Sequence, residues 1–214
     1  MPEKMHQQSG FDLPDKHVWY EVLLGRQPVL RLGLGLTPMI GAAVTLASGL
    51  CLAALTALTL LSGSVLLSLL RKQMAKRGRM GLLLRLMVFM LLSAAGGWVV
   101  TLALPEMAVD LGIYLPLCGV SALLLYGWER QEVSVVAKAA PNAAVTGSAY
   151  VLAALLFSAL REVLGKGSIG GASLFAQAPL GILALPMGGF VLMGLLMGGW
   201  AVLAGRLQRW TKRW

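Results

Sequence analysis

Long stretches without a charged residue set the pattern of this sequence. There are five of them, covering residues 32–70, 86–105, 111–128, 139–160 and 167–205. A helix needs about 20 predominantly apolar residues to cross a bilayer. The three middle stretches have 20, 18 and 22 residues, so each predicts one crossing. The chain is therefore expected to be an all-α integral membrane protein.

The first and last stretches each run for 39 residues, slightly less than two full crossings and a turn require. Both are interrupted by helix breakers, which are Gly33, Gly35, Pro38 and Gly41 in the first and Gly170, Gly171, Pro179, Gly181 and Pro186 in the last. Each stretch could hold one full helix plus a shorter, broken one, or kinked but otherwise ordinary helices. Interrupted segments in corresponding places of two halves favour an inverted-repeat fold with a functional region near the midplane.

The charges between the stretches predict how the chain is oriented in the membrane. The connection at 71–85 and the tail at 206–214 are basic, whereas the connection at 106–110 carries two acidic residues and no basic one. Basic loops remain on the cytoplasmic side. We therefore expect a cytoplasmic N-terminal arm at 1–27, a domain of six transmembrane helices at 28–205 and a basic cytoplasmic tail.

Composition supports a membrane protein and excludes several other classes. Hydrophobic residues make up 57% of the chain and charged residues 13%, whereas soluble domains carry roughly 25% charged residues. A net charge of +9 would indicate a nucleic-acid partner in a soluble protein, but the basic cytoplasmic loops explain it here. The lipid bilayer is therefore the expected partner, not nucleic acid. Cys51 and Cys118 both lie in apolar stretches, which is typical of buried thiols and not of a disulfide framework.

Short motifs follow one another along these stretches. They are Leu34-Gly35-Leu36-Thr37-Pro38, Gly112-Ile113-Tyr114-Leu115-Pro116-Leu117, Leu160-Arg161-Glu162-Val163-Leu164-Gly165-Lys166-Gly167 and Leu185-Pro186-Met187-Gly188-Gly189-Phe190, with Glu129 after the second. In this order and spacing they resemble motifs of the E subunit of the Rnf (Rsx) membrane electron-transport complex. The homologous D subunit of the sodium-pumping NADH:quinone reductase is similar. The resemblance covers the chain from about Gln27 to Gly205.

The resemblance assigns two positions to an iron–sulfur cluster. In that family cysteines stand where this chain has Thr37 and Ala122, and with two cysteines of a homologous A-type partner they hold a 2Fe-2S cluster. A threonine hydroxyl is a hard, weakly acidic ligand that does not ordinarily replace a thiolate on iron, and alanine offers no ligand. We therefore expect no firm cofactor from this chain itself. Cys118, four residues before Ala122, is the remaining candidate metal ligand.

The resemblance also implies a function. The chain would be a non-catalytic membrane subunit of a complex that couples electron transfer between ferredoxin and NAD to proton or sodium translocation. It would act as a scaffold or electron-relay partner of the A-type subunit, in the bacterial inner membrane with both termini cytoplasmic. Other subunits would carry FMN, riboflavin and further iron–sulfur clusters.

Two polar positions are candidates for an ion pathway. Glu162 ends the fifth predicted span beside Arg161, and Asn142 stands where the family has an aspartate. An ionisable residue at membrane depth indicates a functional site by default, although an interfacial ion pair that caps a helix end also fits Glu162. A stand-alone small transporter or channel that shares the fold is the alternative function. The scarcity of buried charges argues against that alternative.

Overall fold

Four long helices form the frame of the chain. The computed structural model describes residues 29–30, 33–70, 79–121, 123–124, 136–175 and 177–211. Within these residues the helices long and apolar enough to cross a membrane are α4 (Leu46–Leu69), α6 (Arg79–Ala103), α10 (Val136–Lys166) and α11 (Pro186–Thr211). Ala122, Glu129, the arm at 1–27 and most of the basic connection after α4 lie outside the described residues.

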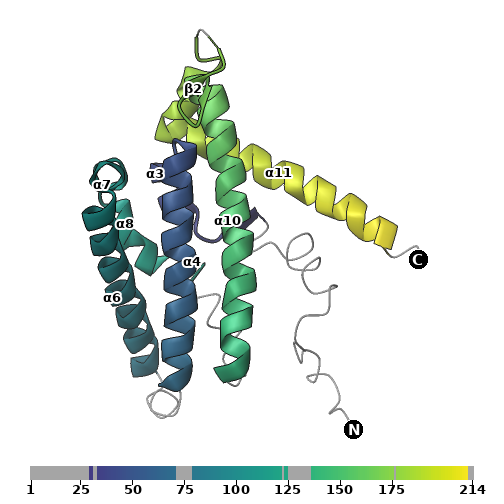
Figure 1. Ribbon diagram of the computed structural model, residues 1–214. Helices are drawn as coiled ribbons and strands as arrows, with labels where there is room; N and C mark the ends of the chain where they lie inside the picture. The colour runs from purple at the N-terminus through teal and green to yellow at the C-terminus, as the bar shows by residue number, and fades with distance from the viewer. Residues whose placement is uncertain are drawn as a thin grey trace.

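Helices α4, α6 and α10 run side by side, and α11 leaves the upper end of this bundle obliquely (Figure 1). The pair α4–α10 packs most extensively because small residues let the helices approach closely. A Cβ placed on Gly49 would lie 2.5 Å from Cβ of Ser158, and one on Gly147 would lie 3.2 Å from Cβ of Ala57. The α4–α10 interface is therefore the most closely packed part of the described fold.

The first charge-free stretch holds one short and one full helix, as one of the two interpretations predicted. The short helix is α3 (Leu36–Ala42), and three residues separate it from α4. Thr45 caps α4 through a reciprocal capping box with Ser48, whose main-chain N–H lies 3.2 Å from Oγ1 of Thr45. The turn between the two helices therefore has a defined geometry.

The stretch at 111–128, expected to be one uninterrupted crossing, is broken. After α7 (Pro105–Leu111) it forms α8 (Tyr114–Leu117) and the 3₁₀ helix η2 (Cys118–Val120), and Ser121 is then extended with ψ 134°. A proline and a glycine within one turn oppose a continuous helix. Ser93 of α6 also stabilises the break, because its hydroxyl donates to the carbonyl of Leu115 at 2.9 Å.

The last stretch also begins with an irregular segment. A two-stranded hairpin, β1 (Ser168–Ile169) with β2 (Ala172–Ser173), is followed by the 3₁₀ helix η3 (Gly181–Ala184) and then by α11. The described residues thus contain four full-length spans and several interrupted segments, so they do not confirm the predicted count of six transmembrane helices.

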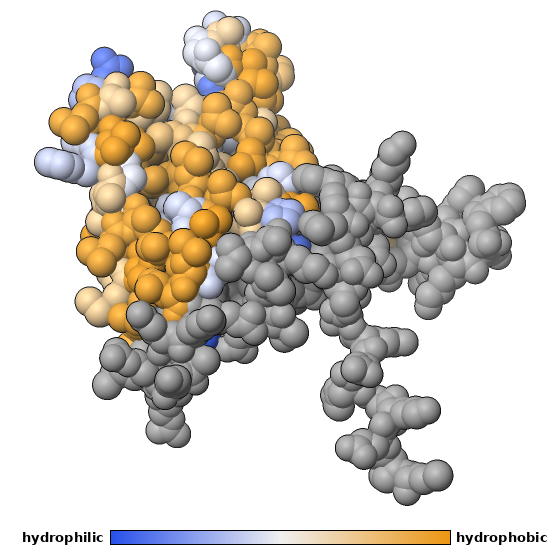
Figure 2. Space-filling model, turned by 60° about the horizontal axis from the view of Figure 1, so that its bottom comes forward, coloured by the Kyte–Doolittle hydropathy of each residue, from blue (hydrophilic) through white to orange (hydrophobic). Residues whose placement is uncertain are grey.

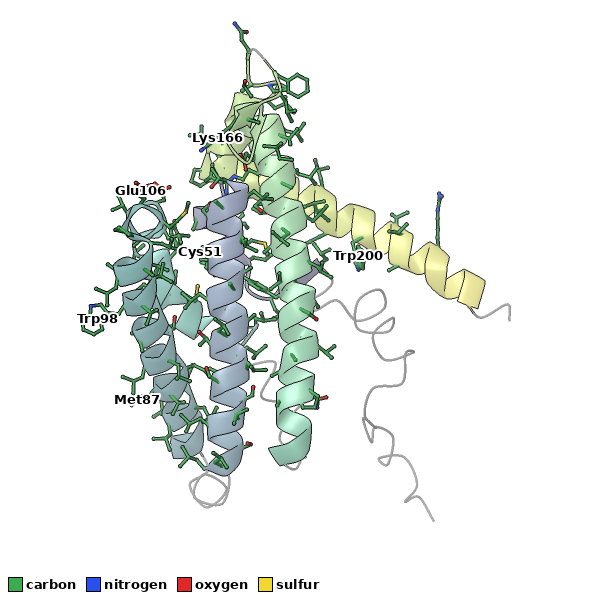
Figure 3. All side chains as sticks on the ribbon, viewed as in Figure 1. Cys51, Met87, Trp98, Glu106, Lys166 and Trp200 are labelled. Carbon is green, nitrogen blue, oxygen red and sulfur yellow. The ribbon has the colours of Figure 1, made fainter. Side chains whose placement is uncertain are left out.

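The described bundle has a charged residue of each sign at one end and an apolar outer surface. Glu106 and Lys166 lie at the same end, as expected if both belong to connections on one side of the membrane (Figure 3). Apolar side chains cover most of the described surface in Figure 2. Trp98 and Leu102 of α6 and Leu195 of α11 are about 70% exposed. A surface of this kind suits lipid or other membrane subunits and not water.

Candidate functional site

The interrupted first stretch and the interrupted stretch at 111–128 meet at one point against α10. We call this point the crossing and define it by Gly35, Ser121, Leu123 and Tyr150. A Cβ placed on Gly35 would lie 2.9 Å from Cε2 of Tyr150, 3.4 Å from Cβ of Leu123 and 3.5 Å from Oγ of Ser121. The segment that follows the second motif therefore packs directly against the first motif. The resemblance assigned a cluster position to each of these segments, and the structure brings the segments together.

Local geometry explains why these residues make the crossing. Gly35 adopts a left-handed conformation, with φ 76° and ψ 16°, which residues with a side chain rarely take. The hydroxyl of Ser121 accepts a hydrogen bond of 3.2 Å from the main-chain N–H of Leu123, replacing a helical bond at the break. Tyr150 lies near the middle of the apolar window Ala140–Lys166 of α10, so the crossing lies deep in the membrane.

Of the two positions assigned to cluster cysteines, the structure describes Thr37 but not Ala122. Thr37 is exposed in the first turn of α3, two residues from Gly35. Ala122 lies outside the described residues, but its neighbours Ser121 and Leu123 are both buried at the crossing. Thr37 offers a hydroxyl, and the alanine at position 122 offers no ligand. The donor set that this chain brings to the crossing does not fit thiolate ligation of iron.

Cys118, the remaining candidate ligand, is directed into the fold. It is fully buried, and its thiol lies 3.2 Å from the main-chain carbonyl oxygen of Tyr114, one turn earlier. It shares one apolar core with Tyr150. The structure thus gives Cys118 an internal hydrogen-bond partner, whereas Thr37 lies on the surface.

Arg161 and Glu162 form a second polar site, near the upper end of α10, and both are buried, with exposed fractions of 0% and 3%. The Arg161 guanidinium donates four hydrogen bonds to main-chain carbonyl oxygens. They run from Nη1 to Ile40 (2.6 Å) and Ala43 (3.4 Å), from Nε to Leu183 (2.8 Å) and from Nη2 to Ala184 (3.2 Å). The side chain thereby joins α10 to the end of α3 and to η3.

Glu162 and Asn142, the two candidate ion-pathway residues, lie far apart. An oxygen of Glu162 accepts a 2.6 Å hydrogen bond from the main-chain N–H of Leu46, the first residue of α4. Asn142 is half-buried near the other end of α10, where its main-chain carbonyl accepts a hydrogen bond of 3.0 Å from the Thr146 hydroxyl. Twenty residues of helix separate the two by about 30 Å. The structure does not bring them together, and the Glu162 geometry is that of a helix cap.

Two features of these sites were not identified from the sequence. Tyr150 is completely buried, and its hydroxyl has no hydrogen-bond partner among the described residues. A lone tyrosine inside an apolar stretch was the available signal. Gly189, in the last motif, approaches Arg161 so closely that an added Cβ would lie 3.2 Å from Cζ of the guanidinium. The third and fourth motifs therefore meet at Arg161.

Comparisons with known proteins identify the family to which this chain is similar. Residues 16–197 match the family model described as Rnf-Nqr subunit, membrane protein. The chain is 30% identical over 183 residues to the E subunit of the Na(+)-translocating ferredoxin:NAD(+) oxidoreductase complex of Acetobacterium woodii, with 82% of this chain and 90% of that protein covered. It is also 30% identical over 213 residues to the E subunit of the ion-translocating oxidoreductase complex of Shewanella amazonensis, with coverage of 90% and 89%.

Proposed function

The chain belongs to the Rnf-Nqr family of membrane subunits, and from this premise we propose that it is the E-type subunit of an ion-translocating ferredoxin:NAD oxidoreductase complex. One relative named as the E subunit of a ferredoxin:NAD(+) oxidoreductase complex and one named as the E subunit of an ion-translocating oxidoreductase complex match it over most of their own length. The observation that carries the proposal is the crossing, where two interrupted segments of the resembled motifs meet at membrane depth. The complex couples electron transfer to the movement of sodium ions or protons.

The proposed partner at the crossing is a homologous A-type membrane subunit. Thr37 is exposed two residues from Gly35, on a surface that is otherwise rich in apolar side chains. In a complex, a second membrane subunit covers this surface, and flavin and iron–sulfur subunits complete the assembly. We infer a location in the bacterial inner membrane from the family of the chain. The charges of the connections favour a cytoplasmic position of both termini.

The role of this chain at the crossing is positional. Neither a threonine hydroxyl nor a buried thiol bonded to its own helix supplies an accessible thiolate. The chain therefore contributes the frame that faces the partner and not the soft ligands of a cluster. Electron transfer in the complex depends on groups that other subunits hold.

Purification of the chain from membranes in mild detergent tests this proposal. A tagged chain is expected to co-purify with a homologous membrane subunit and with flavin and iron–sulfur subunits. Its deletion is expected to lower ferredoxin:NAD oxidoreductase activity in membrane vesicles. A stable solitary chain that catalyses ion flux in liposomes would contradict the proposal and support the stand-alone transporter. The structure argues against that alternative, because Arg161 and Glu162 bind main-chain groups.

A further inference from the structure

We propose that Arg161 is a positioning residue whose guanidinium fills a cage of main-chain carbonyl oxygens as a tethered cation, and so fixes α3 relative to α10. This inference goes beyond the proposed function, because it concerns how the chain holds its broken helices. It does not depend on which electrons or ions the complex moves.

One side of the cage is the C-terminal end of α3. The last carbonyl groups of any helix lack intrahelical partners and carry the negative end of its dipole. At this end the carbonyls of Ile40, in the last turn of α3, and of the C-cap residue Ala43 accept bonds from Nη1 of Arg161. Broken helices of membrane transporters commonly use such ends to coordinate a free cation. Here the cation belongs to the chain itself.

The other side of the cage comes from the segment before α11. Nε of Arg161 donates to Leu183 and Nη2 donates to Ala184, both at the end of η3. One planar guanidinium thus joins two segments whose nearest bonded residues, Ala43 and Leu183, are 140 positions apart in the sequence. A lysine ammonium is a point charge and does not reproduce this divergent fork.

The surroundings make the four carbonyls necessary for a charged guanidinium. Arg161 is fully buried, the ring centroid of Phe157 lies 5.8 Å from its Cζ, and Gly189 packs against it. A buried charge is tolerated only when hydrogen bonds replace its water. While Arg161 remains, a transported cation cannot take these oxygens, so the break after α3 is closed as an ion site.

The adjacent Glu162 binds the other helix end at the same turn, the start of α4. It accepts the N–H of Leu46 at the positive end of α4, while Arg161 binds the negative end of α3. The turn between α3 and α4 is therefore held at both helix ends by neighbouring residues of α10. Ile40 lies five residues after Gly35, about 8 Å along the helix, so a shift at the cage moves the crossing.

Chemical rescue of Arg161→Ala in the purified complex tests the proposal. Lys166→Ala is the matched control, because Lys166 is exposed in the last turn of the same helix. The expected result is a fall in the folding equilibrium of this chain on the order of 100-fold or more for Arg161→Ala and little change for Lys166→Ala. Millimolar guanidinium should restore the thermal stability of Arg161→Ala in a saturable way and should do nothing for the control.

A local readout separates positioning from general stability. Hydrogen exchange of the amides at 36–45 should speed up in Arg161→Ala and slow again when guanidinium is added. Equal recovery with sodium chloride at the same ionic strength would overturn the proposal, as would an Arg161→Ala complex as stable as Lys166→Ala. If Arg161→Ala does not accumulate, Arg161→Lys replaces it. Arg161→Lys is expected to be less stable than Lys166→Arg, and equal stability of the two would also overturn the proposal. These measurements use the chain in its complex or alone, so they remain decisive whether or not the proposed assembly is found.

Discussion

Replacement of Gly35 by alanine tests the crossing through a single methyl group. Gly35 has φ 76°, and a Cβ at this position would lie 2.9 Å from Cε2 of the buried Tyr150. Two costs therefore add: the left-handed backbone conformation and the overlap with a ring that the core holds in place. The conformational cost is local to the backbone, whereas the overlap arises only if the first interrupted segment packs at mid-depth against α10 as the structure describes.

The magnitude follows from these two terms. An alanine in the left-handed region costs about 1–2 kcal/mol. Ordinary carbon contacts lie at about 3.5–4.0 Å, so a separation of 2.9 Å is an overpacked contact, which typically costs about 1–3 kcal/mol. Gly35→Ala is therefore expected to lower the free energy of unfolding by about 2–5 kcal/mol.

Gly171→Ala is the matched control. Gly171, in the β1–β2 turn, has φ 89°, and a Cβ placed there would meet no atom within 4 Å. It incurs the conformational cost alone, so it should destabilise the chain by about 1–2 kcal/mol. Unfolding in mixed detergent micelles, followed by tryptophan fluorescence, measures both variants. Equal destabilisation of the two would refute the packing of Gly35 against Tyr150.

Three further substitutions probe other contacts with matched controls. Gly188→Ala should destabilise the chain by about 1–3 kcal/mol, because a Cβ there would collide with the main chain of Ile182. Gly194→Ala on the same helix is the control, since a Cβ there has open space and should be neutral or slightly stabilising. Similar thermal melts of the two variants would contradict the packing of η3 on α11. Glu162→Ala should lower the free energy of unfolding by about 1–2 kcal/mol, because it removes the hydrogen-bond acceptor that caps Leu46. Glu106→Ala is the control and should change stability little, because Glu106 is exposed. An unchanged unfolding midpoint for Glu162→Ala would exclude the cap. Ser93→Ala should lower the free energy of unfolding by about 1–3 kcal/mol and speed hydrogen exchange at 112–121, because it removes the donor to Leu115 from a buried site. Ser62→Ala is the control, because among the described residues the Ser62 hydroxyl bonds only within α4. Equal exchange in both variants would show that Ser93 does not stabilise the break.

The full-length spans could be predicted because the bilayer imposes a strong rule. A membrane-spanning segment must remain apolar for about 20 residues, so the charge-free stretch at 139–160 marks the body of α10 (Val136–Lys166). An interruption of the first stretch could also be predicted, because Gly35 directly precedes α3 and is a helix breaker, whereas Pro38 lies in the first turn of α3, where a proline is tolerated. The break at Ser121 was missed, because Pro116 and Gly119 alone are tolerated in many membrane helices. What stabilises it is a hydroxyl on α6, which is remote in sequence.

The partners of Arg161 could not be predicted from the sequence. The motif that contains Arg161 was recognised, but its hydrogen-bond partners are main-chain carbonyls 22 to 121 residues away. Every residue has a backbone carbonyl, so no residue type in the sequence indicates which carbonyls form the cage. The same reason explains why a helix cap and an ion pathway were both open for Glu162. Only the fold shows that α4 begins beside that carboxylate.

The central claim is that this chain retains the frame of the family's intramembrane site without bringing thiolates to it. Iron content and the EPR spectrum of the purified complex test it most directly, with the wild-type chain compared with the Thr37→Cys, Ala122→Cys double variant. The account predicts a gain of about two iron atoms per complex and a new cluster signal in the double variant, because both thiolates then return to the frame. Equal iron content and identical spectra in the two complexes would contradict it.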